Sequence, residues 1–351
     1  MKLSKPKYLF LSPVAMKSAN VALRRQNFVE KVVLFGGDDG GRDFISFKKL
    51  FIDSKDLSND VYEGRKTNRK QNVALMMCSS GTTGLPKGVQ ITQENIFGYF
   101  ERYSTHSETF LEATFNCLNI IPWSHVYGAL IILQTITSKA SVVFLPKFHE
   151  THFLECIEKY ECFFAFMVPT LMAWLAKTPL ISNYNISSLM GVLSSGATLS
   201  KDIEEAVRAR TNIIYILNTY GLSESTGGII CSTTEPEANK PGSVGIVTPG
   251  VYIKIIDLVT GETLGPNQRG EICIKGDCVM KGYIDDVDAT TKLIQDGWIH
   301  SGDIGYYDKD YGYQVPPAEI EGILLKHPKI ADAAVIGKDD REVGELPTAF
   351  V

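Results

Sequence analysis

Short apolar runs that alternate with helix-like stretches constrain the fold of this chain more than any other feature. Each run is too short to be a buried helix, and the stretches between them carry helical periodicity. Strands that alternate with helices in this way predict an α/β fold whose sheets are largely buried. The apolar runs occupy residues 73–78, 118–123, 141–146 and 190–195, and the helix-like stretches include 92–104, 151–160 and 200–210.

The regions before and after this alternation differ from it. Residues 8–14, 18–31 and 32–35 predict a strand, a helix and a second strand. After Pro241 the strands become amphipathic and the turns denser, most clearly over residues 251–276. Alternation of apolar and polar residues is typical of half-exposed strands, so this part predicts a β-subdomain.

Composition excludes several classes of protein. The 351 residues carry a net charge of −5 and are 44% hydrophobic, which indicates a globular chain of about two domains and argues against nucleic acid as a partner. The longest uncharged apolar run, residues 162–176, is interrupted by Pro169. A membrane-spanning helix needs about 18 apolar residues, so we expect a buried core segment and no transmembrane segment.

The strongest local motif is SSGTTGLPKG at residues 79–88, directly after an apolar run. Glycines let the backbone wrap closely around an anion, hydroxyl groups add hydrogen-bond donors, and a lysine adds a positive charge. The spacing is not that of a Walker A loop. The motif predicts a phosphate-binding loop, with a polar surface loop as the alternative. Its residues are Ser79, Ser80, Gly81, Thr82, Thr83, Gly84, Lys87 and Gly88.

Five motifs in order resemble the AMP-forming acyl-adenylate superfamily, which includes acyl-CoA synthetases, 4-coumarate–CoA ligases and beetle luciferases. They lie at residues 79–88, 194–200, 218–225, 269–276 and 296–310. Residues 312–340 are similar to the start of the family's small C-terminal domain. The resemblance implies an α/β fold: part of the large N-terminal domain, with layered sheets and a β-subdomain, over residues 1–310, then a fragment of the small α+β domain over residues 311–351.

The resemblance also implies a chemistry. Family members join ATP and a carboxylic acid into an acyl-AMP with release of pyrophosphate, and coenzyme A then displaces AMP; in luciferases oxygen reacts with the adenylate instead. The implied cofactors and partners are ATP, Mg²⁺, coenzyme A and a small carboxylic acid. By the same resemblance, the catalytic residues are Lys87, Thr82, Thr83, His125 and Glu224.

The resemblance assigns the nucleotide site residue by residue. Residues 79–84 and Lys87 match the phosphate loop, Ser223 matches a hydroxyl that contacts phosphate, and Glu224 matches the Mg²⁺ ligand. Asp303 matches the aspartate that accepts hydrogen bonds from the ribose. The residues matched to the adenine site are Gly196, Ala197, Tyr220, Gly221 and Leu222.

The acid is expected near His125, which matches a histidine at the mouth of the family's acyl pocket. We expect the pocket wall at Tyr127, Gly128, residues 192–196 and residues 227–229. The alternatives are ordinary structural ones: His125 as a buried core histidine, Asp303 as a turn residue and Glu224 as a surface acid.

Three departures from the family pattern limit the expected activity. The chain begins midway through the large domain, the family's hinge is missing between Asp310 and Gly312, and the sequence ends before the catalytic lysine of the small domain. We therefore expect nucleotide docking, slow adenylation and loss of the thioester step. A luciferase, a nucleotide-binding pseudoenzyme and an incomplete sequence of a full ligase remain open. The resemblance implies a peroxisomal location, but the C-terminal targeting tripeptide is absent from this sequence. The cytoplasm is therefore the alternative expectation.

Overall fold

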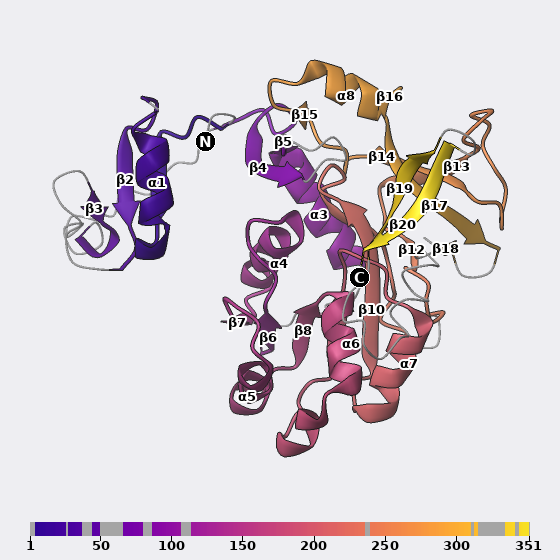
Figure 1. Ribbon diagram of the computed structural model, residues 1–351, viewed down its shortest axis with the longest axis horizontal. Coiled ribbons are helices and arrows are strands. Elements are labelled where there is room, and N and C mark those ends of the chain that lie inside the picture. Colours follow the sequence, from indigo (N-terminus) through magenta and orange to yellow (C-terminus); the bar gives the residue numbers. More distant parts are fainter. Residues whose placement is uncertain are drawn as a thin grey trace. The chain divides into compact units, whose positions relative to one another are not determined.

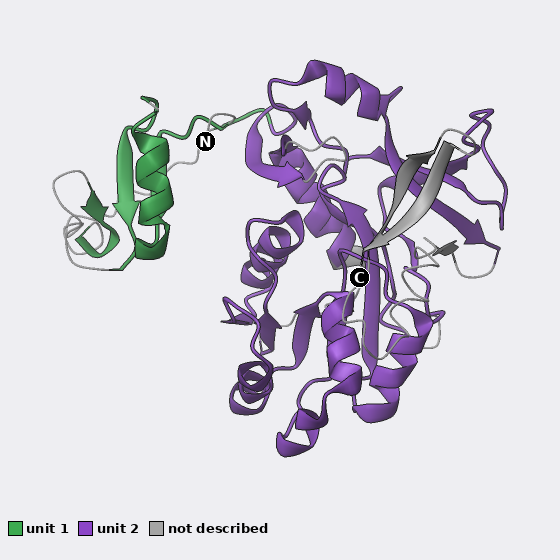
Figure 2. Ribbon diagram, viewed as in Figure 1, with its two compact units in different colours: residues 1–68 green, residues 69–351 purple. Residues whose placement is uncertain are grey.

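The computed structural model forms two compact units, residues 1–68 and residues 69–351 (Figure 2). It describes residues 4–25, 27–36, 44–49, 66–79, 86–106, 114–235, 239–309, 312–314, 334–340 and 344–350. Each unit is considered by itself. Among the described residues, no helix is long and apolar enough to cross a membrane.

The first unit is a small parallel sheet with one helix. Strands β1 (Tyr8–Leu11), β2 (Lys31–Leu34) and β3 (Ile45–Ser46) pair in that order. The short turn η1 (Pro13–Ala15) and helix α1 (Met16–Leu23) connect the first two strands. The predicted strand–helix–strand order is confirmed, but the helix ends at Leu23 rather than near Lys31. The amides of Glu30 and Lys31 donate to the Lys7 carbonyl, so these two residues pair beside β1 and are not part of the helix.

A seven-stranded sheet forms the centre of the second unit (Figure 1), with strand order β12-β11-β10-β9-β8-β6-β7. The strands from β7 to β10 are parallel, and β11 and β12 are antiparallel additions. This arrangement confirms the α/β prediction. The bounds are β6 (Asn116–Asn119), β7 (Ser141–Phe144), β8 (Phe164–Met167), β9 (Gly191–Ser194), β10 (Tyr215–Leu222), β11 (Gly227–Cys231) and β12 (Ile246–Val247).

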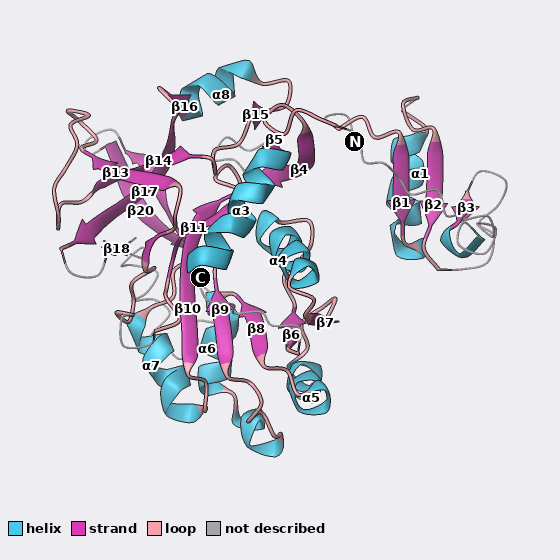
Figure 3. Ribbon diagram, turned by 180° about the vertical axis from the view of Figure 1, so that it is seen from behind, coloured by secondary structure: helices cyan, strands magenta, loops and turns pink. Residues whose placement is uncertain are grey.

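Helices cover both faces of this sheet (Figure 3). Side chains alternate between faces along a strand, and β8 shows the consequence. Phe164 and Phe166 pack in the cluster with α3 (Gln93–His106) and α4 (Val126–Thr137). Ala165 and Met167 pack in the other cluster, with three helices and a short turn. These are α5 (Glu150–Tyr160), α6 (Pro169–Lys177), η2 (Pro179–Asn183) and α7 (Lys201–Arg210).

Two smaller sheets complete the part that positions the site. One has the order β15-β5-β4, and the other has the order β13-β14-β17-β16, with β18 paired to β17. The second sheet packs on its own apolar cluster, which confirms the predicted β-subdomain. The bounds are β4 (Val73–Ser79), β5 (Lys87–Thr92), β13 (Val251–Ile256), β14 (Gly270–Gly276), β15 (Gly282–Tyr283), α8 (Val287–Leu293), β16 (Ile294–Gln295), β17 (Trp298–Asp308) and β18 (Gly312–Gln314).

The last described strands, β19 (Ala334–Asp340) and β20 (Gly344–Phe350), pair with each other as an antiparallel hairpin. Residues 310 and 311, where we place the boundary between the two domains, lie outside the described residues. The division into residues 1–310 and 311–351 therefore stays a prediction.

Candidate active site

The phosphate motif connects two antiparallel strands, β4 and β5. Strand β4 ends at Ser79, β5 begins at Lys87, and these two residues are direct partners in the strand register. Ser79 is buried and Lys87 is half-buried. The pairing brings the first hydroxyl and the lysine of the motif together. The remaining predicted loop residues, Ser80, Gly81, Thr82, Thr83 and Gly84, lie outside the described residues.

Tyr283 connects this hairpin to Glu224. Its hydroxyl donates a 2.7 Å hydrogen bond to Oε1 of Glu224, and its ring centroid lies 5.0 Å from Nζ of Lys87. The Glu224 carbonyl also accepts from the amide of Met280 at 2.9 Å. Burial and the Glu224 carboxylate raise the pKa of Tyr283, so the phenol remains a donor. The backbone and side chain of Glu224 are therefore held by different residues.

Tyr220 holds Asp303 in a similar way. The Tyr220 hydroxyl donates to Oδ2 of Asp303 at 2.7 Å, although the two residues are 83 positions apart. The amide of Asp303 donates to Oγ of Ser301 at 3.0 Å, and that hydroxyl donates to the Ile272 carbonyl. Burial raises the pKa of Asp303. The turn between Ser301 and Asp303 is thereby fixed against β14.

One pocket of about 890 Å³ collects these groups. It contains Lys87 from the hairpin, Lys292 from α8, and carboxylates from three parts of the chain. Such a mixture suits a polar ligand that carries negative charge and a bound cation. The lining residues are Cys78, Ser79, Lys87, His125, Gly196, Gly221, Leu222, Ser223, Glu224, Tyr283, Asp286, Asp288, Ala289, Lys292, Leu293, Ser301 and Asp303.

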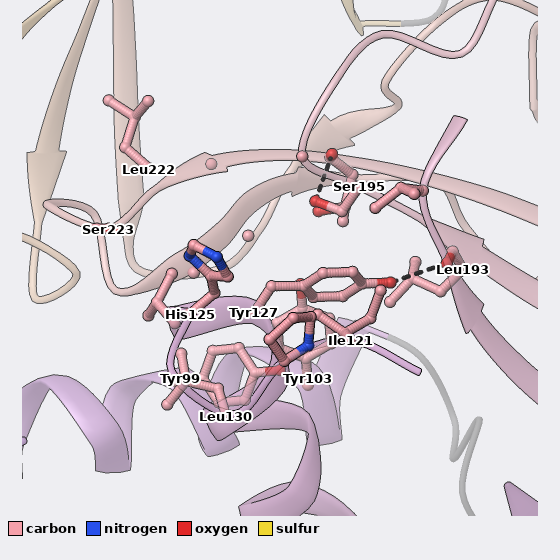
Figure 4. A pocket seen from close by; sticks show the side chains of 18 residues that line it. Tyr99, Tyr103, Ile121, His125, Tyr127, Leu130, Leu193, Ser195, Leu222 and Ser223 are labelled. Atoms are coloured by element: carbon pink, nitrogen blue, oxygen red, sulfur yellow. Dashed lines mark hydrogen bonds between the residues drawn. The ribbon is translucent and has the colours of Figure 1, made fainter. Parts of the chain in front are cut away.

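A second pocket, of about 420 Å³, is lined mainly by aromatic and aliphatic side chains (Figure 4). The hydroxyl of Tyr127 donates to the Leu193 carbonyl at 2.8 Å, and that of Tyr99 donates to Oε1 of Gln134 at 3.0 Å. Because these hydroxyls are engaged in the wall, the tyrosines present mainly their rings to the cavity. The other lining residues are Tyr103, Ile121, Pro122, His125, Val126, Leu130, Val168, Ser195, Gly196, Thr219, Gly221, Leu222, Ser223, Gly227 and Gly228.

The two pockets share five lining residues: His125, Gly196, Gly221, Leu222 and Ser223. His125 immediately precedes α4 and is exposed, so it is not a buried core histidine. Gly221 follows an irregularity in the pairing of β10 with β11, and a Cβ there would collide with the Gly227 carbonyl. The polar cavity and the apolar cavity therefore meet at a wall of small groups and one imidazole.

Several predicted site residues line neither pocket. Ala197, predicted for the adenine site, is exposed and absent from both linings. Of the predicted acyl-pocket wall, Gly128, Val192, Ser194 and Ile229 are also outside both linings. A Cβ at Gly128 would collide with the Pro122 carbonyl, so this glycine serves the close packing at the start of α4. Tyr220 reaches the polar pocket only through its hydrogen bond to Asp303.

Other pocket residues are not in the predicted set. Tyr99 and Tyr103 are four positions apart in a predicted helix, and this spacing puts them on one face, which is a signal that could identify them. Tyr283 lies outside the motifs that predict the site. Its contact with Glu224 depends on the pairing of β15 with β5, which no local pattern reveals.

Comparison with known proteins agrees with this arrangement. Residues 1–284 match the AMP-binding enzyme family, and residues 319–351 match the AMP-binding enzyme C-terminal domain. A luciferin 4-monooxygenase of Nipponoluciola cruciata is 44% identical over 82% of this chain and 55% of its own length. A probable 4-coumarate–CoA ligase of Dictyostelium discoideum is 34% identical over 99% of this chain and 67% of its own length.

A solved structure of similar fold is a red-emitting luciferase from Phrixothrix hirtus, with a TM-score of 0.74 and 32% identity over 88% of this chain and 72% of that one. The chain thus spans about 55 to 67% of the length of the curated relatives it matches. The hairpin motif, the paired pockets and the match over residues 1–284 lead to one conclusion: the chain belongs to the AMP-binding enzyme family of adenylate-forming enzymes.

Proposed function

We propose that this chain activates a carboxylic acid with ATP, as an AMP-forming acid–CoA ligase. The observation that carries the proposal is the junction of a polar pocket with an apolar pocket at His125, Gly196 and Ser223. A ligand whose acyl part fills one pocket and whose nucleotide fills the other would place its reacting carboxylate at this junction.

The first step forms one bond and breaks one. A carboxylate oxygen attacks the α-phosphorus of ATP, and the bond from that phosphorus to the bridging oxygen of pyrophosphate breaks. Two anions must approach, so positive charge and oriented donors are required. Lys87 at the hairpin end and Ser223 at the junction would supply them, while Asp303 would accept hydrogen bonds from the ribose.

The residues present fit a magnesium ion. Glu224 presents a carboxylate in the polar pocket, with Asp286 and Asp288 also in the lining. Mg²⁺ is commonly held by one or two carboxylates together with substrate phosphates. When bound, it would neutralise charge on the phosphates. Tyr283 would orient Glu224 for this task.

The acid would be aromatic or a short to medium aliphatic acid, because rings and branched side chains line a cavity of about 420 Å³. In the second step of such a ligase, the thiol sulfur of coenzyme A would attack the acyl carbon, AMP would leave and the thiol would lose its proton. Because the family's hinge is missing between Asp310 and Gly312, we expect this second step to be lost in this chain. The name of the Dictyostelium relative supports a ligase of this kind.

The test is acid-dependent release of pyrophosphate from Mg-ATP, measured over a panel of aryl and fatty acids. Release that requires both the acid and Mg²⁺, and that falls strongly in Lys87→Ala, supports the proposal. Saturable ATP binding with no acid-dependent release would contradict it and select a nucleotide-binding pseudoenzyme.

A luciferin monooxygenase is the second candidate, favoured by the 44% identity to the Nipponoluciola relative. In that reaction, oxygen rather than a thiol would react with the adenylate. Arg102, on the helix α3 that follows the phosphate loop, is buried, paired to Asp277 and outside the lining of the apolar pocket, so it is not placed to contact a luciferin bound there. Light emission with luciferin and Mg-ATP would select the monooxygenase, and pyrophosphate release without light would exclude it.

A further inference from the structure

Three potential metal ligands of different types converge on one face of the β-subdomain sheet, and none of them lines either pocket. Glu271 and Cys273 lie two apart on β14, so their side chains share a face. His300 on β17 is the direct register partner of Cys273. Among the described residues, these three form the single group of histidine, cysteine and acidic side chains whose ligand atoms all lie within 4.8 Å of one another.

The distances match those of a small tetrahedral site. Nδ1 of His300 lies 3.0 Å from Oε2 of Glu271 and 3.7 Å from Sγ of Cys273. A zinc ion with bonds of about 2.0–2.3 Å separates its nitrogen and oxygen ligands by about 3.3 Å and its nitrogen and sulfur ligands by about 3.6 Å. An ion could therefore replace the proton between Glu271 and His300 with shifts of a few tenths of an ångström.

The site is partly accessible, with Cys273 buried and the other two ligands partly exposed, and its charges balance. The side chains of Glu271 and His300 are 15% and 24% exposed, which leaves room for a water as fourth ligand. Burial raises the pKa of Cys273 to about 11, so its thiol proton would leave to solvent as the ion binds. The carboxylate and thiolate then carry two negative charges opposite a divalent cation. The neighbouring cations, Lys254 and Lys275, are directed over the ring of Trp298.

We propose that Glu271, Cys273 and His300 form a binding site for a thiophilic divalent cation of the zinc type. Glu271 uses its other oxygen, Oε1, to accept a 2.9 Å hydrogen bond from the amide of Gly302. A cation bound through Oε2 would leave this bond in place and fix the turn that carries Asp303. The site would therefore be structural, beside the turn whose residues Ser301 and Asp303 line the polar pocket, and it does not depend on the proposed reaction.

The test uses Cd²⁺ as a spectroscopic probe, because a cadmium–thiolate bond gives an ultraviolet charge-transfer band. We expect one equivalent of Cd²⁺ to give the band in the full chain and Zn²⁺ to displace it. Cys273→Ser should abolish the band, while the matched control Cys78→Ser, which removes the exposed thiol, should keep it. His300→Gln and Glu271→Gln should each weaken Cd²⁺ binding by at least about tenfold.

We expect the His300→Gln variant to fold, because the glutamine amide can still donate a hydrogen bond to Glu271. Circular dichroism should show native secondary structure in this variant, and Zn²⁺ should raise the melting temperature of the wild-type chain but not of the variant. A band that survives Cys273→Ser would overturn the proposal. Equal Cd²⁺ affinity in wild type and His300→Gln would overturn it as well, and would leave Glu271 and His300 as a hydrogen-bonded pair that only supports the turn.

Discussion

Replacing Tyr283 with phenylalanine isolates one hydrogen bond of the candidate site. The change removes the hydroxyl that donates to Glu224 at 2.7 Å and keeps the ring near Lys87. A hydrogen bond to a charged group contributes about 1.5–3 kcal/mol. Water can reach the half-buried Glu224 in the open pocket and offset part of the loss. We therefore expect the lower end of this range, which corresponds to about tenfold weaker binding of Mg-ATP.

The assay is calorimetric titration of the purified chain with ATP at saturating Mg²⁺ and with AMP in the absence of Mg²⁺. If Tyr283 orients Glu224 for the cation, Tyr283→Phe weakens Mg-ATP binding and leaves AMP binding nearly unchanged. Tyr252→Phe is the matched control, because Tyr252 is 66% exposed on β13 and outside both pockets. Equal loss for ATP and AMP, or no loss for either, would refute this reasoning.

Three further predictions concern the two pockets and one buried ion pair of the second unit. Cys78 is the exposed cysteine of the seven and lines the polar pocket, so an alkylating reagent should modify it first and Mg-ATP should slow that reaction; modification unaffected by Mg-ATP would contradict the placement. Val168→Phe should fill the apolar pocket and weaken acid binding by at least about tenfold without changing ATP affinity, as equilibrium dialysis would show. Arg102→Met removes a 2.9 Å ion pair to Asp277 and should lower the free energy of unfolding by about 2 kcal/mol in urea denaturation; a loss below about 0.5 kcal/mol would show that the pair is dispensable.

The layered architecture could be predicted from sequence because it depends on local periodicity. The runs at residues 141–146 and 190–195 each contain a strand of the central sheet, the run at 118–123 overlaps the last two residues of β6, and the helices between them cover the sheet's faces. The β-subdomain followed from alternation in the same way. The length of α1 did not, since the competing pairing of residues 30 and 31 with Lys7 is a tertiary effect.

The site residues show the same difference between local and tertiary effects. Lys87, Glu224 and Asp303 could be identified because each lies in a motif whose residues are contiguous. Tyr283 could not be assigned a role, because it reaches Glu224 across 59 positions. Glu271 and His300 lie in predicted strands, but their contact depends on the register of β14 against β17. Sequence patterns thus located the groups within each segment, whereas the contacts between segments required the fold.

The central claim is that one ligand spans both pockets, and a non-hydrolysable acyl-sulfamoyl adenosine tests it most directly. Linking an acyl group to the nucleotide should make the analogue bind about 100-fold more tightly than AMP. Calorimetry should also show weaker binding in Val168→Phe, at the apolar end, and in Asp303→Asn, at the polar end. An analogue that binds no more tightly than AMP, or whose affinity is unchanged by Val168→Phe, would contradict this claim.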